Sequence, residues 1–241
     1  MGVALVRSKS AAESVERQTR PASPFRLATE VVVFTIRDDD LKVLLVRREP
    51  APFRGSWTLP GDFVGEHESL EAAARRSLLT QTNLEDIYLE QLYTFGEPDR
   101  DPRGRVVSVA YFALSELSRT QPESAPGARW FSVYHLPAMG FDHRRIVDYA
   151  LERLRNKLDY TSVGFELLPR RFTLSELQRV YEIILAKPLD KRNFRKKMFS
   201  LRILKAENLK RRKNGGRPAE LYSLARHRFI RLKDRGILFP F

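Results

Sequence analysis

The stretch LPGDFVGEHESLEAAARRSLLTQTNL, residues 59–84, decides the fold of this chain. It begins as a loop containing Gly61 and Gly65, residues that tolerate the positive φ of a tight turn. Ser69 has the side chain of a helix N-cap, and an alanine-rich run of high helix propensity follows it. Asn83 suits a left-handed C-terminal stop. We therefore expect a glycine-bearing loop and then a helix between Ser69 and Asn83.

This loop and helix resemble the Nudix box, G-x5-E-x7-R-E-U-x-E-E-x-G-U, in which U is apolar. Glu68 and Arg76 keep the first glutamate and the arginine, whereas Asp62 replaces the first glycine. The three glutamates that hold divalent cations in active Nudix enzymes are replaced by Ser77, Thr80 and Gln81. Mg²⁺ prefers anionic oxygen ligands, and these neutral side chains offer little charge to offset its dehydration. We therefore predict no catalytic residues and no metal site. A chance loop before an unrelated amphipathic helix is the alternative.

Length and composition limit what the rest of the chain can be. The 241 residues are enough for two small domains, and the absence of cysteine excludes disulfides and thiolate metal sites. No apolar run approaches the roughly 20 residues of a membrane span, so we expect no membrane partner and a cytoplasmic location. Residues 1–24 lack the apolar segment of a signal peptide and are expected to form a mobile tail.

The positive charge is concentrated at one end of the chain. The net charge of the whole chain is +13. Residues 161–241 hold 21 Lys and Arg against 7 Asp and Glu, a net charge of +14, whereas residues 1–160 carry −1. This asymmetry indicates that one domain binds a polyanion and the other does not. A basic surface that only confers solubility is the alternative.

Strand patterns surround the box. Runs rich in Val, Leu and Ile at residues 30–35 and 41–46 predict an antiparallel hairpin. Further strands are expected over residues 87–94, 106–114 and 128–133. The strand over 106–114 lacks clean alternation with polar residues, so we expect it to be buried on both faces. These elements predict a mixed α/β sandwich over residues 25–140, with the box at its cleft.

We expect this cleft to bind a diphosphate and an attached base. Arginine suits bidentate contacts with phosphate, and aromatic faces suit stacking on adenine. The candidate ligand-binding residues are Arg48, Arg54, Trp57, Phe63, Glu68 and Arg76. Strand alternation directs only one of Arg47 and Arg48 to the cleft, and Arg48 is preferred. A core position for Phe63 and a structural ion pair for Arg76 are the alternatives.

Residues 141–160 are expected to form a linker helix between the neutral and the basic region. Asp142 suits its N-cap, and apolar residues recur at helical spacing as far as about Lys157. His143 has no second His or Cys at ligand spacing, so a polar contact in the first turn is preferred to a metal site. The helix is also a candidate dimer element.

Residues 161–241 carry the pattern of a winged helix-turn-helix. Thr173 and Glu176 fit a capping box before a helix with a core-facing apolar stripe. After a short break at Pro188, Asp190 caps a second, strongly basic helix.

A β-hairpin, the wing, is expected next over residues 206–225, with its tip at residues 214–216. Basic side chains crowd this tip and can contact phosphates. The candidate DNA-binding residues are Lys191, Arg192, Asn193, Arg195, Lys196 and Lys197 in the helix and Lys210, Arg211, Arg212, Lys213 and Arg217 in the hairpin. A solvated run of charge is the alternative.

After residue 25 the chain resembles the NrtR family of Nudix-related transcriptional regulators. The matching segments are PFRGSWTLPGDFV, FDHRRIVDYALERLRNKLDYT, FTLSELQRVYEIIL with LDKRNFRKKM, and GGRPAELY. The resemblance implies an α/β Nudix sandwich followed by a small winged helix-turn-helix domain. It also implies a homodimer that binds a palindromic operator and regulates, as a repressor, genes of NAD metabolism. ADP-ribose or a related pyridine nucleotide is the implied effector, and no cofactor is required.

The expected mechanism places two recognition helices in successive major grooves. Asn193 with Arg192 or Arg195 would read bases, and Lys196, Lys197 and the hairpin would mainly contact phosphates. An effector regulates only if it binds the DNA-competent and DNA-incompetent states unequally. The alternatives are an active ADP-ribose or nucleoside-diphosphate pyrophosphatase, a general nucleic-acid binder, and a regulator of pentose-use genes.

Overall fold

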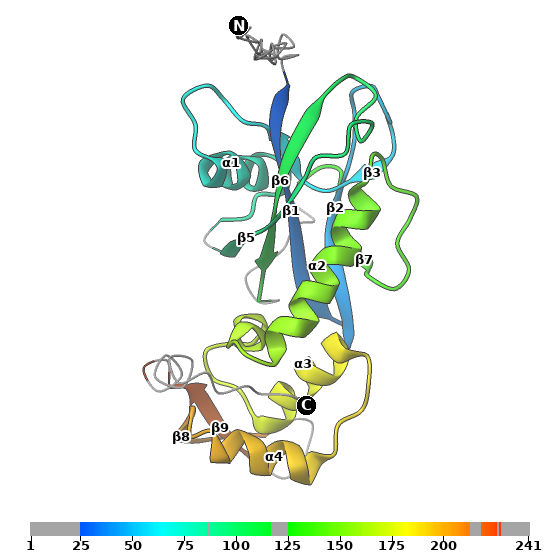
Figure 1. Ribbon diagram of the computed structural model, residues 1–241. Coiled ribbons are helices and arrows are strands. Elements are labelled where there is room, and N and C mark those ends of the chain that lie inside the picture. The colour runs from blue at the N-terminus through cyan, green and yellow to red at the C-terminus, as the bar shows by residue number, and fades with distance from the viewer. Residues whose placement is uncertain (1–24, 86, 117–124, 213–217, 226, 228–241) are drawn as a thin grey trace, which may run out of the picture.

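The computed structural model describes residues 25–85, 87–116, 125–212, 218–225 and 227 (Figure 1). The expected mobile tail, the tip of the hairpin, and the candidate DNA-binding residues Lys213 and Arg217 lie outside these residues. Within the described part of the chain, no helix has the length and apolar character that crossing a membrane requires.

A seven-stranded mixed sheet forms the first part of the molecule. Its strands are β1 (Arg26–Arg37), β2 (Asp40–Arg47), β3 (Trp57–Thr58), β4 (Gly61–Phe63), β5 (Tyr88–Phe95), β6 (Val106–Leu114) and β7 (Ala128–Ser132). The order is β3-β2-β1-β6-β5, while β4 pairs with β1 and β7 with β2. The β1–β2 hairpin is antiparallel, and β1 runs parallel to β6. The mixed α/β sheet expected from the sequence is confirmed.

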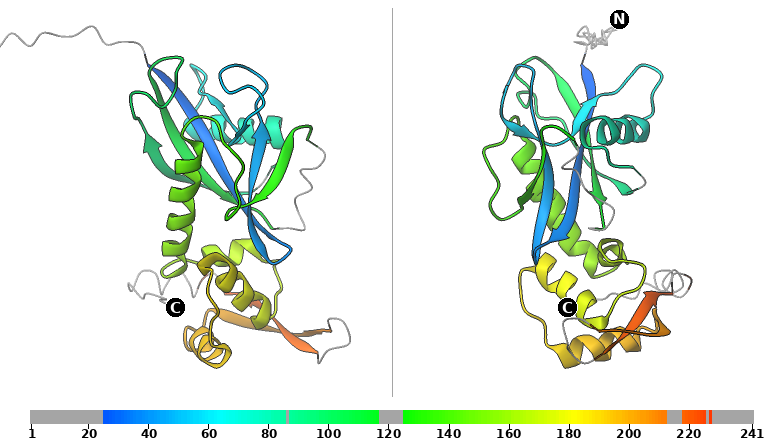
Figure 2. Two further views of the ribbon diagram at one scale, coloured as in Figure 1. Left: turned by 90° about the vertical axis from the view of Figure 1, so that its right-hand side faces the viewer. Right: turned by 180° about the vertical axis from the view of Figure 1, so that it is seen from behind.

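One helix covers each face of the sheet, so its central strands are buried on both sides. On β1, Val31 and Val33 pack with Leu78 of α1 (Leu70–Thr82), while Val32 and Phe34 pack with Ile146 of α2 (His143–Leu158). Figures 1 and 2 show the two helices on opposite sides of the sheet. All but one residue of β6 are likewise buried, as the lack of alternation predicted.

Helix α1 begins and ends where the sequence predicted. The hydroxyl of Ser69 accepts a hydrogen bond from the Ala72 N–H at 3.2 Å. Asn83 adopts the left-handed conformation, with φ 55°, and its N–H donates to the Leu79 carbonyl. Both caps depend on groups close in sequence, which is why the local pattern was sufficient.

The prediction that the Asp142 side chain caps α2 is wrong. Asp142 occupies the N-cap position, but its side chain makes no capping hydrogen bond. The carboxylate instead accepts two hydrogen bonds from Arg100, at 2.7 and 3.0 Å. A buried guanidinium is a stronger partner for a carboxylate than a backbone N–H, so the long-range ion pair replaces the local cap.

The second part of the molecule is a winged helix. Its elements are the 3-10 helix η3 (Val163–Leu167), α3 (Leu174–Leu185), α4 (Lys191–Ser200), β8 (Leu204–Arg211) and β9 (Ala219–Leu224). Thr173 and Glu176 form the expected capping box, and Asp190 caps α4 by accepting from the Asn193 N–H at 2.7 Å. β8 and β9 form the expected antiparallel hairpin.

A single apolar core joins the sheet to the winged helix. It runs from Phe34 and Phe112 through Leu154 of α2 to Tyr181 of α3 and Phe194 of α4. At the surface, Arg179 of α3 forms an ion pair of 3.0 Å with Asp39 in the β1–β2 turn. The winged helix lies at the end of the molecule opposite the start of β1 (Figure 1).

Candidate functional site

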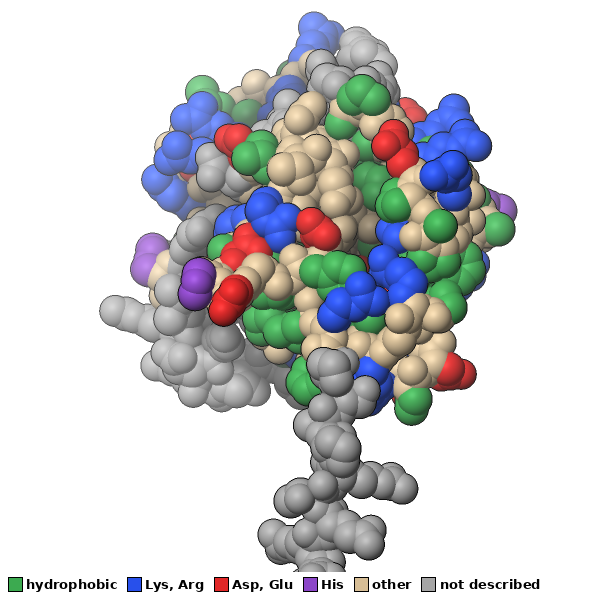
Figure 3. All heavy atoms as spheres, turned by 90° about the horizontal axis from the view of Figure 1, so that it is seen from above, with side chains coloured by type: hydrophobic (Ala, Val, Ile, Leu, Met, Phe, Trp, Pro, Cys, Tyr) green, Lys and Arg blue, Asp and Glu red, His purple; other side chains and the backbone are tan. Residues whose placement is uncertain are grey.

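A cavity of about 530 Å³ lies beside the box. This volume is typical of sites for nucleotides and other small ligands. The walls come from β1, the end of β2, β4, the last turn of α1, the loop before β6 and the residues leading into α2. Its charged lining residues are Glu30, Arg47, Arg48, Glu49, Asp62, Arg100, Asp101 and Arg103. Figure 3 shows the end of the molecule opposite the winged helix, where basic and acidic side chains interleave.

Arginines stack on the aromatic rings that line one wall of this cavity, and Arg26, which is not itself a lining residue, contributes one of these contacts. The guanidinium of Arg26 lies 4.6 Å from the ring centre of Phe63, and that of Arg103 lies 5.2 Å from the same ring. Arg103 also lies 5.5 Å from the ring centre of Phe141, on which Arg48 stacks at 5.0 Å. These cation–π contacts hold the long side chains in place, so the guanidinium groups are preorganised for an anion.

Arg48 is the cation of this wall that lacks a close carboxylate. Asp101 neutralises Arg103 through hydrogen bonds as short as 2.6 Å. In the part of the chain that the structure describes, no carboxylate lies within 4 Å of the Arg48 guanidinium, whose Nε donates to the Pro52 carbonyl at 2.7 Å. Burial and the charge of Arg103 lower the pKa of Arg48. The lack of a directly paired carboxylate makes Arg48 the leading candidate for phosphate contact.

A buried ion network forms the inner end of the cavity. The Arg100 side chain is 3% exposed and lies between the carboxylates of Asp142 and Glu30, at 2.7 and 3.7 Å. Burial acts to lower the pKa of Arg100, but the Asp142 hydrogen bonds and the Glu30 charge outweigh it and raise the pKa. His143 accepts a hydrogen bond from the Leu59 N–H on Nδ1, at 2.9 Å, which confirms the predicted polar contact.

The box positions that lack glutamate contact the backbone. The Ser77 and Thr80 hydroxyls donate to carbonyls of their own helix, at 2.9 and 2.8 Å. The Gln81 amide donates to the Gly61 carbonyl at 2.9 Å and accepts from the Gly61 N–H at 3.2 Å. In the described residues, no group of three or more His, Cys, Asp or Glu side chains could hold a metal ion.

Four of the six predicted ligand-binding residues do not line the cavity. Arg76 forms hydrogen-bonded ion pairs with Glu68 and Asp62, both at 2.8 Å, and these raise the pKa of Arg76. Trp57 packs against Phe131 with ring centres 4.7 Å apart. Arg54 is exposed and donates to the Glu49 carbonyl. Of the six, only Arg48 and Phe63 are lining residues.

Arg47, the last residue of β2, and Arg48, which follows it, both line the cavity, which contradicts the prediction that only one of them would. β2 ends at Arg47, so the alternation of strand side chains does not extend to Arg48. The residues that sequence reasoning missed are Glu30, Arg100, Asp101, Arg103 and Phe141. Glu30 carried a signal, because an acid inside the apolar run TEVVVF is unusual in a buried strand.

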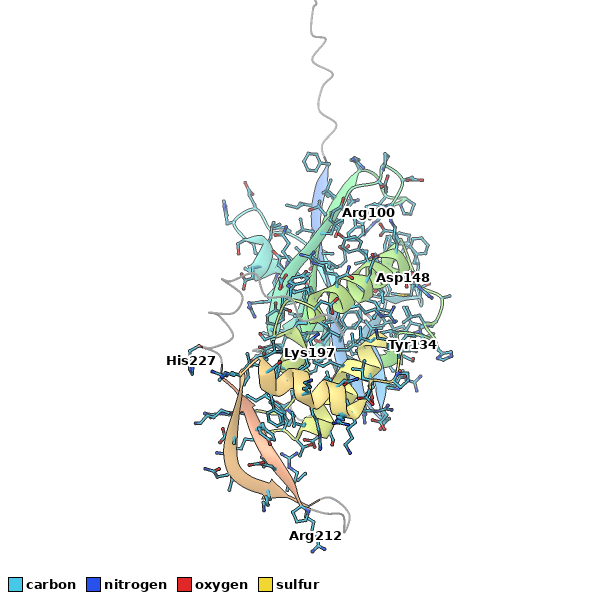
Figure 4. The ribbon with its side chains drawn as sticks, turned by 60° about the horizontal axis from the view of Figure 1, so that its bottom comes forward. Arg100, Tyr134, Asp148, Lys197, Arg212 and His227 are labelled. Atoms are coloured by element: carbon cyan, nitrogen blue, oxygen red, sulfur yellow. The ribbon has the colours of Figure 1, made fainter. Side chains whose placement is uncertain are left out.

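Helix α4 presents a basic outer face. Phe194 and Met198 are buried against the core. The exposed candidates on the same helix are Lys191, Arg192, Asn193, Arg195 and Lys196. Lys197 is half-buried, and its burial lowers the pKa of its ammonium group, so it is less available to DNA than predicted. Figure 4 labels Lys197 near this helix and Arg212 at the far end of the hairpin.

One predicted DNA-binding residue of the hairpin has a structural partner. Arg211 donates to the Glu176 carboxylate at 3.0 Å and to the Arg171 carbonyl at 2.9 Å. It therefore ties the hairpin to the start of α3, and it is less available to DNA than predicted. Lys210 and Arg212 are exposed.

Comparison with known proteins matches both parts of the chain. Residues 26–150 match the NUDIX domain, and residues 164–224 match the NrtR DNA-binding winged helix domain. The ADPR responsive transcriptional repressor NtrR of Acinetobacter baylyi is 35% identical over 220 residues, which cover 89% of this chain and 85% of that protein.

Solved structures of similar proteins contain both kinds of ligand. Shewanella oneidensis NrtR complexed with a 27mer DNA superimposes with a TM-score of 0.77 at 38% identity, covering 88% of this chain and 97% of the other. The NUDIX domain of the same protein complexed with ADP ribose gives a TM-score of 0.50 at 40% identity, covering 55% and 90%.

Proposed function

Because the chain belongs to the NrtR family of Nudix-domain regulators, we propose that it is a transcriptional repressor whose Nudix cavity binds ADP-ribose and whose winged helix binds DNA. The observation that carries this proposal is the combination of the arginine-lined cavity and the exposed basic helix α4 in one packed molecule. The relatives crystallised with DNA and with ADP ribose support both ligands.

Helix α2 supplies a physical connection between the two sites. His143, its first residue, lines the cavity. Near its other end, Arg155 donates to the Ile184 carbonyl at the end of α3, at 2.9 Å. Figures 1 and 2 show α2 running from the upper part of the sheet to the winged helix. A ligand that moves His143 or Asp142 would therefore shift α3 and, through the shared core, α4.

We assign residues 25–140 to the sensing domain, 141–160 to the linker helix and 161–241 to the DNA-binding domain. A homodimer on a palindromic operator follows from the usual use of a helix-turn-helix, in which two-fold symmetry of the protein matches that of the site. Genes of NAD metabolism are the proposed targets, because ADP-ribose is a product of NAD breakdown.

We further propose that the Nudix domain has no hydrolase activity. The side chains at the three glutamate positions of the box are neutral and hydrogen-bond to backbone atoms, which supports this. The test is incubation of the purified chain with ADP-ribose and Mg²⁺ or Mn²⁺. No release of AMP is expected, and steady turnover would refute this part of the proposal.

The regulatory proposal is tested by DNA binding. The full chain first selects its operator from a pool of random duplexes. Affinity for that duplex is then measured by gel shift with and without saturating ADP-ribose. The proposal expects a change of about fivefold or more, since allosteric coupling is typically 1–3 kcal/mol. Equal affinity in both conditions would reject ADP-ribose as the effector.

A further inference from the structure

Glu30 has a buried carboxylate oxygen without a partner, and this oxygen belongs to a residue that lines the cavity. The side chain is 9% exposed. Its Oε1 lies 3.7 Å from both Arg100 and His143, too far for a hydrogen bond. Its Oε2 is fully buried and makes no hydrogen bond with any residue that the structure describes. A buried acceptor left unpaired costs about 1–3 kcal/mol, and more when it is charged, so this oxygen calls for a donor.

The position of this carboxylate is fixed by the backbone around it. Glu30 pairs with Ala110 of β6 on one side and with Gly61 of β4 on the other. A Cβ at Gly61 would clash with the Thr29 carbonyl and lie 3.0 Å from the Glu30 Cα, so β4 crosses β1 too closely for any side chain there. The Glu30 side chain therefore cannot retreat from the cavity by a shift of its strand.

The neighbours of Glu30 do not supply the missing donor. Arg100 directs its hydrogen bonds to Asp142. Nδ1 of His143 accepts from the Leu59 N–H, so in the neutral ring the proton lies on Nε2, 3.7 Å from Oε1 of Glu30. The inner end of the cavity thus offers a strong acceptor beside a ring N–H. A hydroxyl group, which both donates and accepts, matches that pair better than an amine, which only donates.

The remaining charges of the cavity indicate where a diphosphate would lie. Arg48, which has no directly paired carboxylate among the described residues, suits a diphosphate, whereas a phosphate beside the Glu30 carboxylate would be repelled. We propose that Glu30 accepts a hydrogen bond from a ribose hydroxyl of the ligand, an inference that rests on the proposed nucleotide-binding function. Glu30 is then a specificity-determining residue of the sensor. The diphosphate provides charge recognition, and the hydroxyl at Glu30 provides selection for the sugar.

Calorimetric titration of the full chain with matched ligands tests this assignment. The ligands are ADP-ribose, ADP (which lacks the second ribose), 2′-deoxy-ADP-ribose and inosine diphosphate ribose (which lacks the base amine). Glu30→Gln should weaken ADP-ribose binding about tenfold to a hundredfold, since hydrogen bonds to charged groups are worth about 1.5–3 kcal/mol. For the ligand that lacks the hydroxyl bound by Glu30, the loss of affinity caused by Glu30→Gln should shrink to less than threefold. If that ligand is ADP, the hydroxyl belongs to the second ribose, and if it is the 2′-deoxy analogue, the hydroxyl belongs to the adenosine ribose.

Glu71→Gln is the matched control, because it makes the same chemical change at an exposed residue of α1 that pairs with Arg75 and does not line the cavity. It should change binding of all four ligands by one common factor. Should Glu30→Gln fail to fold, as judged by its thermal melt, Glu30→Asp serves instead, since it keeps the charge but withdraws the carboxylate. The same penalty for every ligand, or a penalty that shrinks only for the inosine compound, would overturn the inference. Wild-type protein that binds none of the four would instead refute the proposed function.

Discussion

At the scale of single residues, Arg48 is the residue that we propose to bind the anionic part of the ligand. Its guanidinium stacks on Phe141, and burial and the charge of Arg103 lower its pKa although the charge of Asp101 acts in the opposite direction. A bound diphosphate would supply the missing negative charge. This site is therefore poised to gain more from an anionic ligand than a surface arginine that already has an acidic partner.

We predict that Arg48→Gln weakens ADP-ribose binding about tenfold to a hundredfold, because one charge-assisted hydrogen bond is lost. Isothermal titration calorimetry provides the measurement. Arg75→Gln is the control. It removes the same charge from an exposed residue of α1 that is paired with Glu71. Equal losses in the two variants would mean that only net charge matters.

Gly61 sets the geometry of the cavity floor, where β4 meets β1. We predict that Gly61→Ala lowers the free energy of unfolding by about 1–3 kcal/mol, the usual cost of overpacking, because the added methyl group meets backbone atoms. Urea denaturation measures the change. Gly96→Ala is the control, since the nearest atom to its added Cβ is 4.0 Å away. Similar destabilisation of both variants would contradict this explanation.

Sequence reasoning at this scale succeeded where contacts are local. The caps at Ser69, Asn83 and Asp190 depend on groups within four residues, and all three are confirmed. Arg76 and Trp57 do not line the cavity, because the fold pairs Arg76 with Glu68 and Asp62 and packs Trp57 against Phe131. A charged or aromatic residue near a motif does not reveal whether it faces a cavity.

At the scale of elements, α2 is attached to the sheet by a polar contact. Lys157 is buried, and its ammonium donates to both oxygens of Glu90 on β5, at 2.6 and 2.7 Å. Tyr88 also donates to Glu90. Burial acts to raise the pKa of Glu90, but the hydrogen bonds from Lys157 and Tyr88 outweigh it and lower the pKa.

We predict that Lys157→Met lowers the free energy of unfolding by about 1–3 kcal/mol at neutral pH, because Glu90 loses its charged partner. A carboxyl with a lowered folded-state pKa stabilises the fold above its unfolded pKa of about 4.3, and that stabilisation is lost as pH falls through the folded value. The free energies of unfolding of Lys157→Met and wild type, measured by denaturation, should therefore become equal in acid. A difference that persists there would contradict the assignment, and exposed Arg144→Met is the control.

The two parts of the DNA interface should respond differently to substitution. We predict that Asn193→Ala on α4 weakens operator binding about tenfold to a hundredfold and leaves random-DNA affinity unchanged, because base contacts carry specificity. Lys210→Gln in the hairpin should weaken both and reduce the slope of log K against log salt by about one. Binding titrations over a range of salt concentrations measure both effects. A uniform loss for Asn193→Ala would contradict its assignment to base reading.

The order of the elements could be predicted from the hydrophobic pattern of the sequence, but two short strands could not. The helices and long strands predicted from residues 30–35 to 219–224 are present because each is long enough to show its period. β3 and β4 have two and three residues, too few for a pattern. Since β4 brings Gly61 against Glu30, the floor of the cavity could not be predicted from sequence.

At the scale of the whole molecule, we propose that sensing and DNA binding are coupled through packed structure. The apolar core is continuous from the sheet to α4, and α2 has one end at the cavity and the other at α3. In Figure 4, Arg100 and Arg212 lie toward opposite ends of the molecule, so coupling requires movement of whole elements and not direct contact. A ligand achieves this only by binding two arrangements of the elements unequally.

The most direct test of this account is reciprocal linkage in the full chain. ADP-ribose affinity is measured by calorimetry for the free protein and for the protein saturated with its selected operator duplex. Thermodynamic linkage predicts that the two affinities differ by the same factor, about fivefold or more, by which ADP-ribose changes operator affinity. Identical ADP-ribose affinities with and without DNA would contradict the claim that the Nudix cavity controls the winged helix.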